Sequence, residues 1–173
     1  MKFEKTKIKD LYVIDLELRK DMRGHFTRVF DDKMLPFKFK IVQVNKSLTN
    51  KKGTIRGMHF QVKPREEDKY VRCTRGSIYD VIVDLRKNSK SYGKWFGVTL
   101  SQQNNKLVLI PKGCAHGFQS LEDNVEVEYF VSQYYSPEKE SGLRWNDPKL
   151  KIKWPIRNAI LSEKDAAWED IKL

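Results

Sequence analysis

The chain has 173 residues, enough for one domain with a full core, and its 12% of aromatic residues argue against disorder. Its net charge of +11 suits an anionic partner, but the Lys residues are scattered, which favours a solvated surface. No nucleic-acid recognition motif accompanies the charge, so we do not expect nucleic acid as a partner. No apolar run is long enough to cross a bilayer, and the charged first residues lack a signal-peptide core, so we expect a cytoplasmic protein with no membrane partner.

Strand-like alternation is the main pattern along the chain. The predicted strands cover residues 11–18, 41–45, 71–73, 77–85, 95–100, 106–110 and 125–131. Turn residues such as Gly and Asn lie between them, at a spacing typical of a sandwich or barrel. Single helical turns are expected at 32–35 and at 163–168, the second with Ser162 as its N-cap. The sequence therefore predicts an all-β fold with a few short helical turns, forming one domain over residues 1–173.

The two cysteines are expected to be buried thiols. Cys73 and Cys114 lie in or beside apolar runs, lack CxxC spacing and are too few for a disulfide framework.

Two of the three histidines lie in unusual settings. Arg56 and His59 are three positions apart, so on a regular strand they would point to opposite faces. Gly57 between them permits a bend or bulge that could bring them to one side. His116 lies in a second Gly-flanked apolar segment, residues 110–118. This pattern suggests a histidine that acts as a general base.

Two carboxylates and a tyrosine also lie on apolar strands. Asp80 and Asp84 share one face of the predicted strand 77–85, where they need partners. That face is either a solvent-exposed surface or the place of an ion pair with Arg86. Tyr129 lies on the face of Val127, and from the pattern alone it is a core residue.

Nine short motifs, taken in order, resemble the dTDP-4-dehydrorhamnose 3,5-epimerase family from about residue 21 to residue 165. They are QVNKS (43–47), GTIRGMHFQ (53–61), KYVRCTRG (69–76), DVIVDLR (80–86), SYGKW (91–95), IPKGCAHGF (110–118), YSPE (135–138), RWNDP (144–148) and LSEKD (161–165). The resemblance implies a cupin-type jelly roll, usually a homodimer in which an N-terminal segment of one subunit completes its neighbour's site. It also implies a nucleotide-linked 4-keto-6-deoxy sugar as substrate, and no metal or other cofactor.

The sequence supports the absence of a metal independently. Metal-binding cupins typically carry an HxH pair with a Glu and a further His, whereas His59 is followed by Phe60 and Gln61.

Inversion at C3 and C5 of such a sugar needs a base, a group that stabilises the enolate oxygen, and an acid. By resemblance, His59 is the base and Asp165 its partner, which would fix the imidazole tautomer. Lys69 matches the position that faces the C4 oxygen, and Tyr129 matches the acid on the opposite face of the sugar. His116 is expected nearby as a second donor, oriented by Asp84.

The resemblance assigns the nucleotide to a second group of residues. Arg23 and Arg56 suit the diphosphate because guanidinium groups match phosphate oxygens. Phe26 and Tyr135 could pack against base or sugar. The remaining members of this group are Gln43 and Asn45.

One residue departs from the family pattern. Thymidine-using members commonly read RGxFxE, whereas this chain has Arg28 at the place of the Glu. Arg28 cannot accept a hydrogen bond but could donate to guanine O6 and N7, so a GDP-linked sugar is an alternative to a dTDP-linked one.

The predicted function is therefore a nucleotide-4-keto-sugar 3,5-epimerase, an isomerase, in the synthesis of surface polysaccharide such as lipopolysaccharide or capsule. One alternative is a C3-only or C5-only epimerase or a ketoisomerase on the same scaffold. Another is a non-catalytic cupin that binds sugar nucleotides, which would not need the set His59, Lys69, Tyr129 and Asp165.

Overall fold

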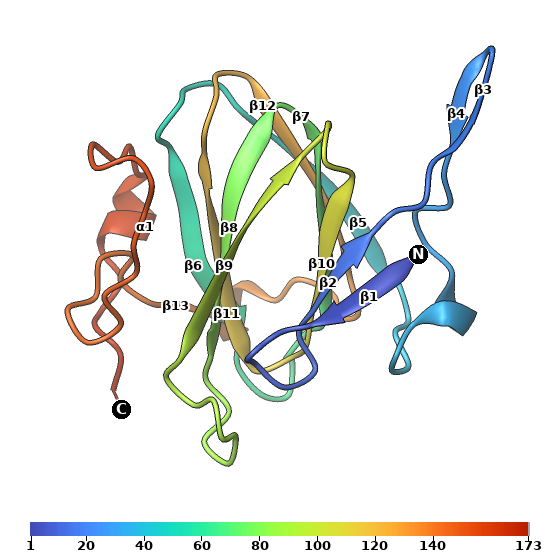
Figure 1. Ribbon diagram of the computed structural model, residues 1–173. Helices are drawn as coiled ribbons and strands as arrows, with labels where there is room; N and C mark the ends of the chain where they lie inside the picture. Colours follow the sequence, from blue (N-terminus) through green and yellow to red (C-terminus); the bar gives the residue numbers. More distant parts are fainter. Residues whose placement is uncertain (173) are drawn as a thin grey trace.

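Two antiparallel sheets face each other in the computed structural model, which describes residues 1–172 (Figure 1). The six-stranded sheet has the order β1 (Lys2–Lys5), β2 (Tyr12–Asp15), β10 (Lys106–Ile110), β7 (Lys69–Arg75), β12 (Val125–Val131), β5 (Gln43–Thr49). The five-stranded sheet has the order β13 (Glu140–Gly142), β6 (Ile55–Gln61), β11 (Cys114–Ser120), β8 (Ser77–Asp84), β9 (Trp95–Ser101). A separate hairpin, β3 (Arg19–Asp21) with β4 (Gly24–Phe26), projects from the body of the molecule.

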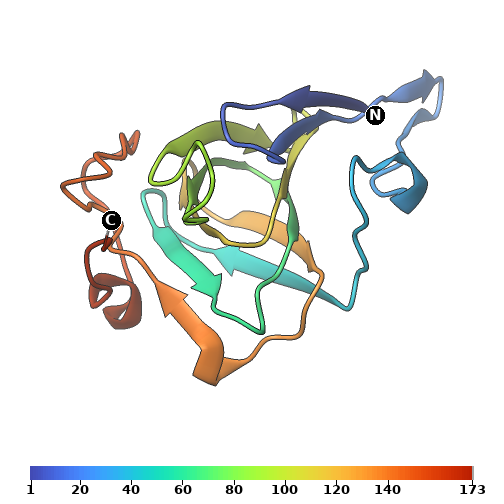
Figure 2. The ribbon, with the colours of Figure 1, turned by 90° about the horizontal axis from the view of Figure 1, so that it is seen from below.

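Both sheets are buried on both faces over much of their area. Between the sheets, side chains such as Val71, Ile82 and Val108 form the central core. The segment that leads into β5 covers the outer face of the six-stranded sheet, and the C-terminal segment covers that of the five-stranded sheet. In the view from below, the strands of the two sheets lie around a common centre (Figure 2), and the side chains of the central core pack between them. A strand that is covered on both faces, such as β10, reads as a continuous apolar run, whereas β5 and β12 alternate in burial.

The all-β prediction is confirmed, and the strand boundaries differ in detail. The strand predicted over 11–18 ends at Asp15, after which the N–H of Leu16 bonds to the carbonyl of Asn105 and the chain leaves the sheet. The strand predicted over 41–45 begins two residues later and extends to Thr49. Sequence reasoning missed β1, β3, β4 and β13, which are short and polar or charged. It also missed β6 and β11, which Gly57 and Gly117 interrupt.

The helical turns lie where they were predicted. They are η1 (Asp32–Met34) and α1 (Glu163–Ala166), together with one that was not predicted, η2 (Pro137–Lys139). Ser162 is the N-cap of α1, since its hydroxyl accepts the N–H of Asp165 at 3.1 Å. This cap fixes the start of the turn that carries Asp165.

Cys73 and Cys114 are both free and buried, as predicted. Burial raises the pKa of Cys73 to about 11 and that of Cys114 to about 12, so both thiols stay protonated at neutral pH. Over residues 1–172, no helix is long and apolar enough to span a membrane.

Candidate active site

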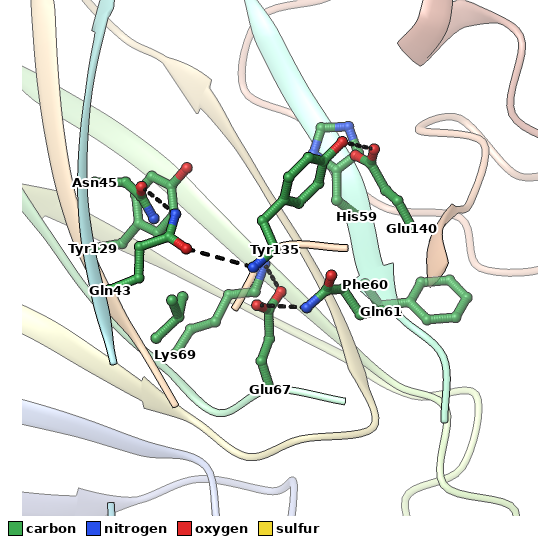
Figure 3. Close-up of a pocket in the computed structure, with 11 residues that line it drawn as sticks. Gln43, Asn45, His59, Phe60, Gln61, Glu67, Lys69, Tyr129, Tyr135 and Glu140 are labelled. Carbon is green, nitrogen blue, oxygen red and sulfur yellow. Dashed lines mark hydrogen bonds and ion pairs between the residues drawn. The ribbon is translucent and has the colours of Figure 1, made fainter. Parts of the chain in front are cut away.

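Two adjoining cavities, of about 380 and 300 Å³, lie between the sheets and share three residues: His59, Lys69 and Tyr129. The larger cavity extends towards Gln43 and Tyr135, and Figure 3 shows its lining. The smaller one extends towards His116 and α1. The three shared side chains come from β6, β7 and β12, so both sheets contribute to the junction.

His59 and Asp165 form a close pair at this junction. Their Nε2 and Oδ1 atoms are 2.6 Å apart, although the residues are 106 positions apart in sequence. The second carboxylate oxygen of Asp165 accepts the N–H of Gly57 at 3.2 Å. Burial is the largest single influence and would raise the pKa of Asp165, but the hydrogen bond and charge of His59, together with the N–H of Gly57, hold that pKa below its usual value. An ionised carboxylate only accepts, so Nε2 donates and Nδ1 keeps the free lone pair.

The chain bends at Gly57, and the bend brings the side chains of Arg56 and His59 to the smaller cavity, which both of them line. The φ of Gly57, +131°, lies in a region that favours glycine. A Cβ here would lie 2.5 Å from the Cα of Gly117 on β11, so the two strands approach closely at this point. The register between β6 and β11 also shifts there.

His116 is oriented by Asp80, not by Asp84 as the sequence analysis expected. The Nε2 of His116 lies 2.7 Å from the Oδ2 of Asp80, which is fully buried. In the pairing of β11 with β8, His116 stands opposite Ile82, so Asp80 and Asp84 are both diagonal neighbours by register. Asp84 instead accepts hydrogen bonds from Arg86 and from a nearby serine turn. The ion pair with Arg86 was one of the two alternatives for this face, and it is confirmed for Asp84.

Lys69 and Tyr129 lie side by side on adjacent strands of the six-stranded sheet. Lys69 is opposite Val131 on β12, and Tyr129 is two residues before Val131 on the same inward face. The side chain of Lys69 is 12% exposed, and its ammonium contacts Glu67 at 2.9 Å. Burial, and then the charge of Glu67, raise the pKa of Tyr129, so the phenol keeps its proton at neutral pH.

The larger cavity contains three of the residues predicted to bind the nucleotide: Gln43, Asn45 and Tyr135. The amide of Gln43 bonds to Asn45 at 2.7 Å and accepts the N–H of Tyr135 at 3.4 Å (Figure 3). The Tyr135 hydroxyl donates to Glu140 at 2.6 Å, which Lys164 also contacts at 2.6 Å. Arg56, another residue predicted to bind the nucleotide, lines the smaller cavity instead. Its guanidinium donates hydrogen bonds to the hydroxyl of Thr49 and to the carbonyl of Leu48.

Three of the residues predicted for the nucleotide lie outside both cavities in the single chain. Arg23 is exposed and paired with Asp21 at 2.7 Å. Phe26, 62% exposed, is on β4, and Arg28 pairs with Asp31 at 3.1 Å. All three belong to the segment around the projecting hairpin, so one chain does not bring them to His59.

The structure adds polar side chains to the site that sequence reasoning did not single out. They are Ser47, Gln61, Glu67, Glu140 and Lys164. Inward alternation on β5 could have indicated Ser47, which follows Gln43 and Asn45 in steps of two. Lys164 is part of the quoted LSEKD motif. Nothing in the sequence indicated Glu67 or Glu140, which look like ordinary surface carboxylates. Within residues 1–172, no group of three or more His, Cys, Asp or Glu side chains is placed to hold a metal ion.

Comparison with known proteins gives a consistent match over nearly the whole chain. The family model for dTDP-4-dehydrorhamnose 3,5-epimerase matches residues 5–172. The epimerase of that name from Shigella flexneri is 41% identical over 165 residues, covering 93% of this chain and 91% of the relative. The one from Methanothermobacter thermautotrophicus is 40% identical and covers 99% of this chain and 95% of the relative.

Solved structures agree with this result. The Bacillus anthracis enzyme with TDP and pyrophosphate bound superposes with a TM-score of 0.95 at 41% identity, covering 98% of this chain and 99% of its own. The Legionella pneumophila enzyme in complex with dTDP-4-keto-L-rhamnose superposes with a TM-score of 0.92 at 36% identity, covering 98% and 92%. A 3'-monoepimerase from Streptomyces bikiniensis is similar at 29% identity and a TM-score of 0.89, covering 95% and 85%. The cupin-type jelly roll is thereby confirmed, and the chain belongs to the dTDP-4-dehydrorhamnose 3,5-epimerase family of isomerases.

Proposed function

We propose that this protein inverts C3 and C5 of a dTDP-linked 4-keto-6-deoxy sugar through an enolate intermediate. The observation that carries the proposal is the 2.6 Å pair of His59 and Asp165 at a cavity junction that also contains Lys69 and Tyr129. A protein that only binds sugar nucleotides would not need a carboxylate-oriented imidazole beside an ammonium and a protonated phenol.

His59 is the proposed base. With its Nε2 hydrogen donated to Asp165, the Nδ1 atom has the lone pair that can take a proton from C3 or C5. The C4 ketone makes both protons acidic, because the resulting charge moves onto the carbonyl oxygen. Asp165 is itself held by the N–H of Gly57 and by the Ser162 cap, so the tautomer of His59 is set before substrate binds.

Lys69 faces the carbonyl oxygen as it becomes negative. An ammonium that is nearly excluded from water stabilises such a charge more strongly than one in bulk solvent, because the local dielectric is lower. His116, held by Asp80, lines the same cavity and is the second group proposed to face the sugar. Removal of either interaction is expected to raise the barrier to enolate formation.

Tyr129 is the proposed acid. Its raised pKa keeps the phenol protonated, and its position on the opposite sheet from His59 allows it to return a proton to the other face of the sugar. Protonation from the opposite face is what inverts a centre. The phenol is then reprotonated from solvent.

The nucleotide is proposed to lie along Arg56, Gln43, Asn45 and Tyr135. We further propose a homodimer in which the projecting hairpin brings Arg23 and Phe26 to the neighbour's site. Their exposure and their distance from the site of their own chain support this arrangement. The names of the relatives described above give no support to the GDP alternative suggested by Arg28. A role in surface polysaccharide synthesis is part of the same proposal, and it rests on the family resemblance.

Deuterium incorporation tests the reaction directly. The protein is incubated with dTDP-4-keto-6-deoxyglucose in heavy water, and exchange at each carbon is followed by NMR. Exchange and inversion at both C3 and C5 are expected, and both should disappear in His59→Ala while nucleotide binding persists. Exchange at a single carbon would identify a monoepimerase, as in the Streptomyces bikiniensis relative, and no exchange at all would exclude epimerase activity on this substrate.

A further inference from the structure

Glu67 places a carboxylate directly against the lysine that is proposed to stabilise the enolate. Its Oε1 atom lies 2.9 Å from the Lys69 Nζ, and both side chains are about nine-tenths buried, at 10% and 12% exposed. Its other oxygen accepts the amide N–H of Gln61 at 3.1 Å. Figure 3 shows the three side chains in a row along the wall of the larger cavity.

Gln61 is itself rigidly held, so Glu67 has a fixed support. Gln61 is 4% exposed, and its amide oxygen accepts the N–H of Ser136 at 2.7 Å. Its amide nitrogen also donates to the carbonyl of Arg65 at 3.0 Å. A chain of hydrogen bonds therefore runs from the backbone through Gln61 and Glu67 to the Lys69 ammonium.

The physical reason for such a chain is the flexibility of lysine. Its ammonium is a point charge on a four-carbon stem, with no planar geometry to fix its direction. When one N–H of the Lys69 ammonium bonds to Glu67, the directions of its other two N–H groups are restricted, and these two remain free to bond to an oxygen in the cavity. The carboxylate also balances the charge of a nearly buried ammonium while the site is empty.

We propose that Glu67 is a positioning residue for the epimerisation: it aims the Lys69 ammonium at the C4 oxygen of the sugar. This inference rests on the proposed function, because Lys69 has this target only if the substrate is a ketosugar. The negative charge of Glu67 would also repel the negative charge of the enolate. Positioning of the ammonium speeds the reaction, whereas this repulsion slows it. If aiming dominates, removal of the carboxylate slows the reaction, and if charge opposition dominates, it speeds the reaction.

The test compares Glu67→Gln, Lys69→Met and the double variant, with kcat and KM measured by deuterium exchange in heavy water. In Glu67→Gln an NH₂ donor replaces one of the two carboxylate oxygens and faces either the Lys69 ammonium or the amide N–H of Gln61, so the hydrogen-bond chain is broken. We expect kcat to fall about 10- to 100-fold with KM nearly unchanged, as for an interaction made in the transition state. In the Lys69→Met background the same substitution should have little further effect, because Glu67 acts through Lys69.

Glu128→Gln is the matched control. Glu128 pairs with Arg72 at 2.6 Å on β12 and β7, the two strands that carry Tyr129 and Lys69. Glu128 is next to Tyr129 and Arg72 is next to Val71, so both side chains of this pair face away from the cavity. Thermal unfolding of each variant separates loss of fold from loss of rate. If Glu67→Gln does not fold, Glu67→Asp keeps the charge but shortens its reach, and it should show the same fall in kcat.

Several results would overturn the inference. They are an unchanged or faster kcat in Glu67→Gln, a fall no larger than in Glu128→Gln, or an equal fall in the Lys69→Met background. A rise in KM alone would show that Glu67 binds substrate directly. Failure of the proposed function itself would look different, since the unmodified protein would then show no exchange on the ketosugar.

Discussion

Replacement of Asp165 by Asn is the sharpest perturbation of the proposed base, because it keeps the size of the side chain while it removes the charge and replaces one acceptor oxygen by an NH₂ donor. The amide has one oxygen and two donors. If the oxygen faces His59, the NH₂ group points at the N–H of Gly57, which now lies 3.2 Å from the carboxylate. Two donors that face each other in a buried site cost about 1–3 kcal/mol.

The other orientation is therefore favoured, and it places the NH₂ group against the Nε2 atom of His59. That nitrogen must then accept, so the imidazole proton moves to Nδ1, the atom that should take the proton from the sugar. A positioned base contributes about 10²–10⁴-fold, so we expect kcat of Asp165→Asn to fall by that factor. At 1.36 kcal/mol per tenfold, this corresponds to about 2.7–5.4 kcal/mol.

The assay is the initial rate of deuterium incorporation at C3 and C5 at pH 7, with nucleotide binding measured in parallel. Asp147→Asn is a suitable control because Asp147 is also buried but accepts only backbone N–H groups, from Lys149, Leu150 and Ile171. This control variant should lower the melting temperature while kcat changes little. If Asp165→Asn keeps more than about a third of the rate while folding and binding normally, the tautomer argument is wrong.

Three further outcomes are expected. Tyr129→Phe should retain exchange at C3 better than inversion at C5, and NMR that shows normal inversion at both centres would exclude Tyr129 as the acid. Asp84→Asn should destabilise the fold by about 2 kcal/mol at pH 7, because hydrogen bonds outweigh burial and lower the pKa of Asp84 from 3.8 to about 2. A carboxyl with a lowered pKa stabilises the folded state at any pH above its pKa in the unfolded chain. The difference between variant and parent in the free energy of unfolding, measured in urea, should therefore shrink as the pH falls from about 4 to about 2. A difference that stays constant over this range would contradict the assignment. If the site is shared between subunits, His59→Ala and Arg23→Ala proteins that are dissociated, mixed and allowed to reassociate should recover about a quarter of full activity at low substrate concentration. The reason is that half of the dimers contain one chain of each variant, and each such dimer has one intact site out of two. If the mixture is no more active than the average of the two variants, the site lies within one chain.

Sequence patterns were sufficient for the all-β class because several strands contain apolar runs that only sheet packing can bury. The jelly roll itself was expected from the family resemblance, and β6 and β11 were not predicted. The N-cap of α1 and the buried cysteines also followed from local chemistry. Boundaries were less accurate, since the end of β2 depends on where Leu16 meets Asn105, a contact that local alternation does not encode.

The family and its set of candidate residues were visible in the sequence, because nine ordered motifs cover nearly the whole chain. The identity of the group that orients His116 was not visible. Alternation places Asp80 and Asp84 on one face, and both are diagonal to His116 in the sheet. The turn after β8 supplies Arg86, Ser89 and Ser91 to Asp84, which leaves Asp80 for the histidine.

By itself, then, the sequence determined the all-β class, the family and the residues that the reaction would require. The pair of His59 with Asp165 was expected from the family resemblance, and the structure brings the two side chains together. Only the tertiary structure decided that His116 pairs with Asp80 and Lys69 with Glu67. The physical reason is that strand periodicity sets the face on which a side chain lies, whereas its partner across the cavity depends on register, bends such as that at Gly57, and the path of a C-terminal segment more than a hundred residues away.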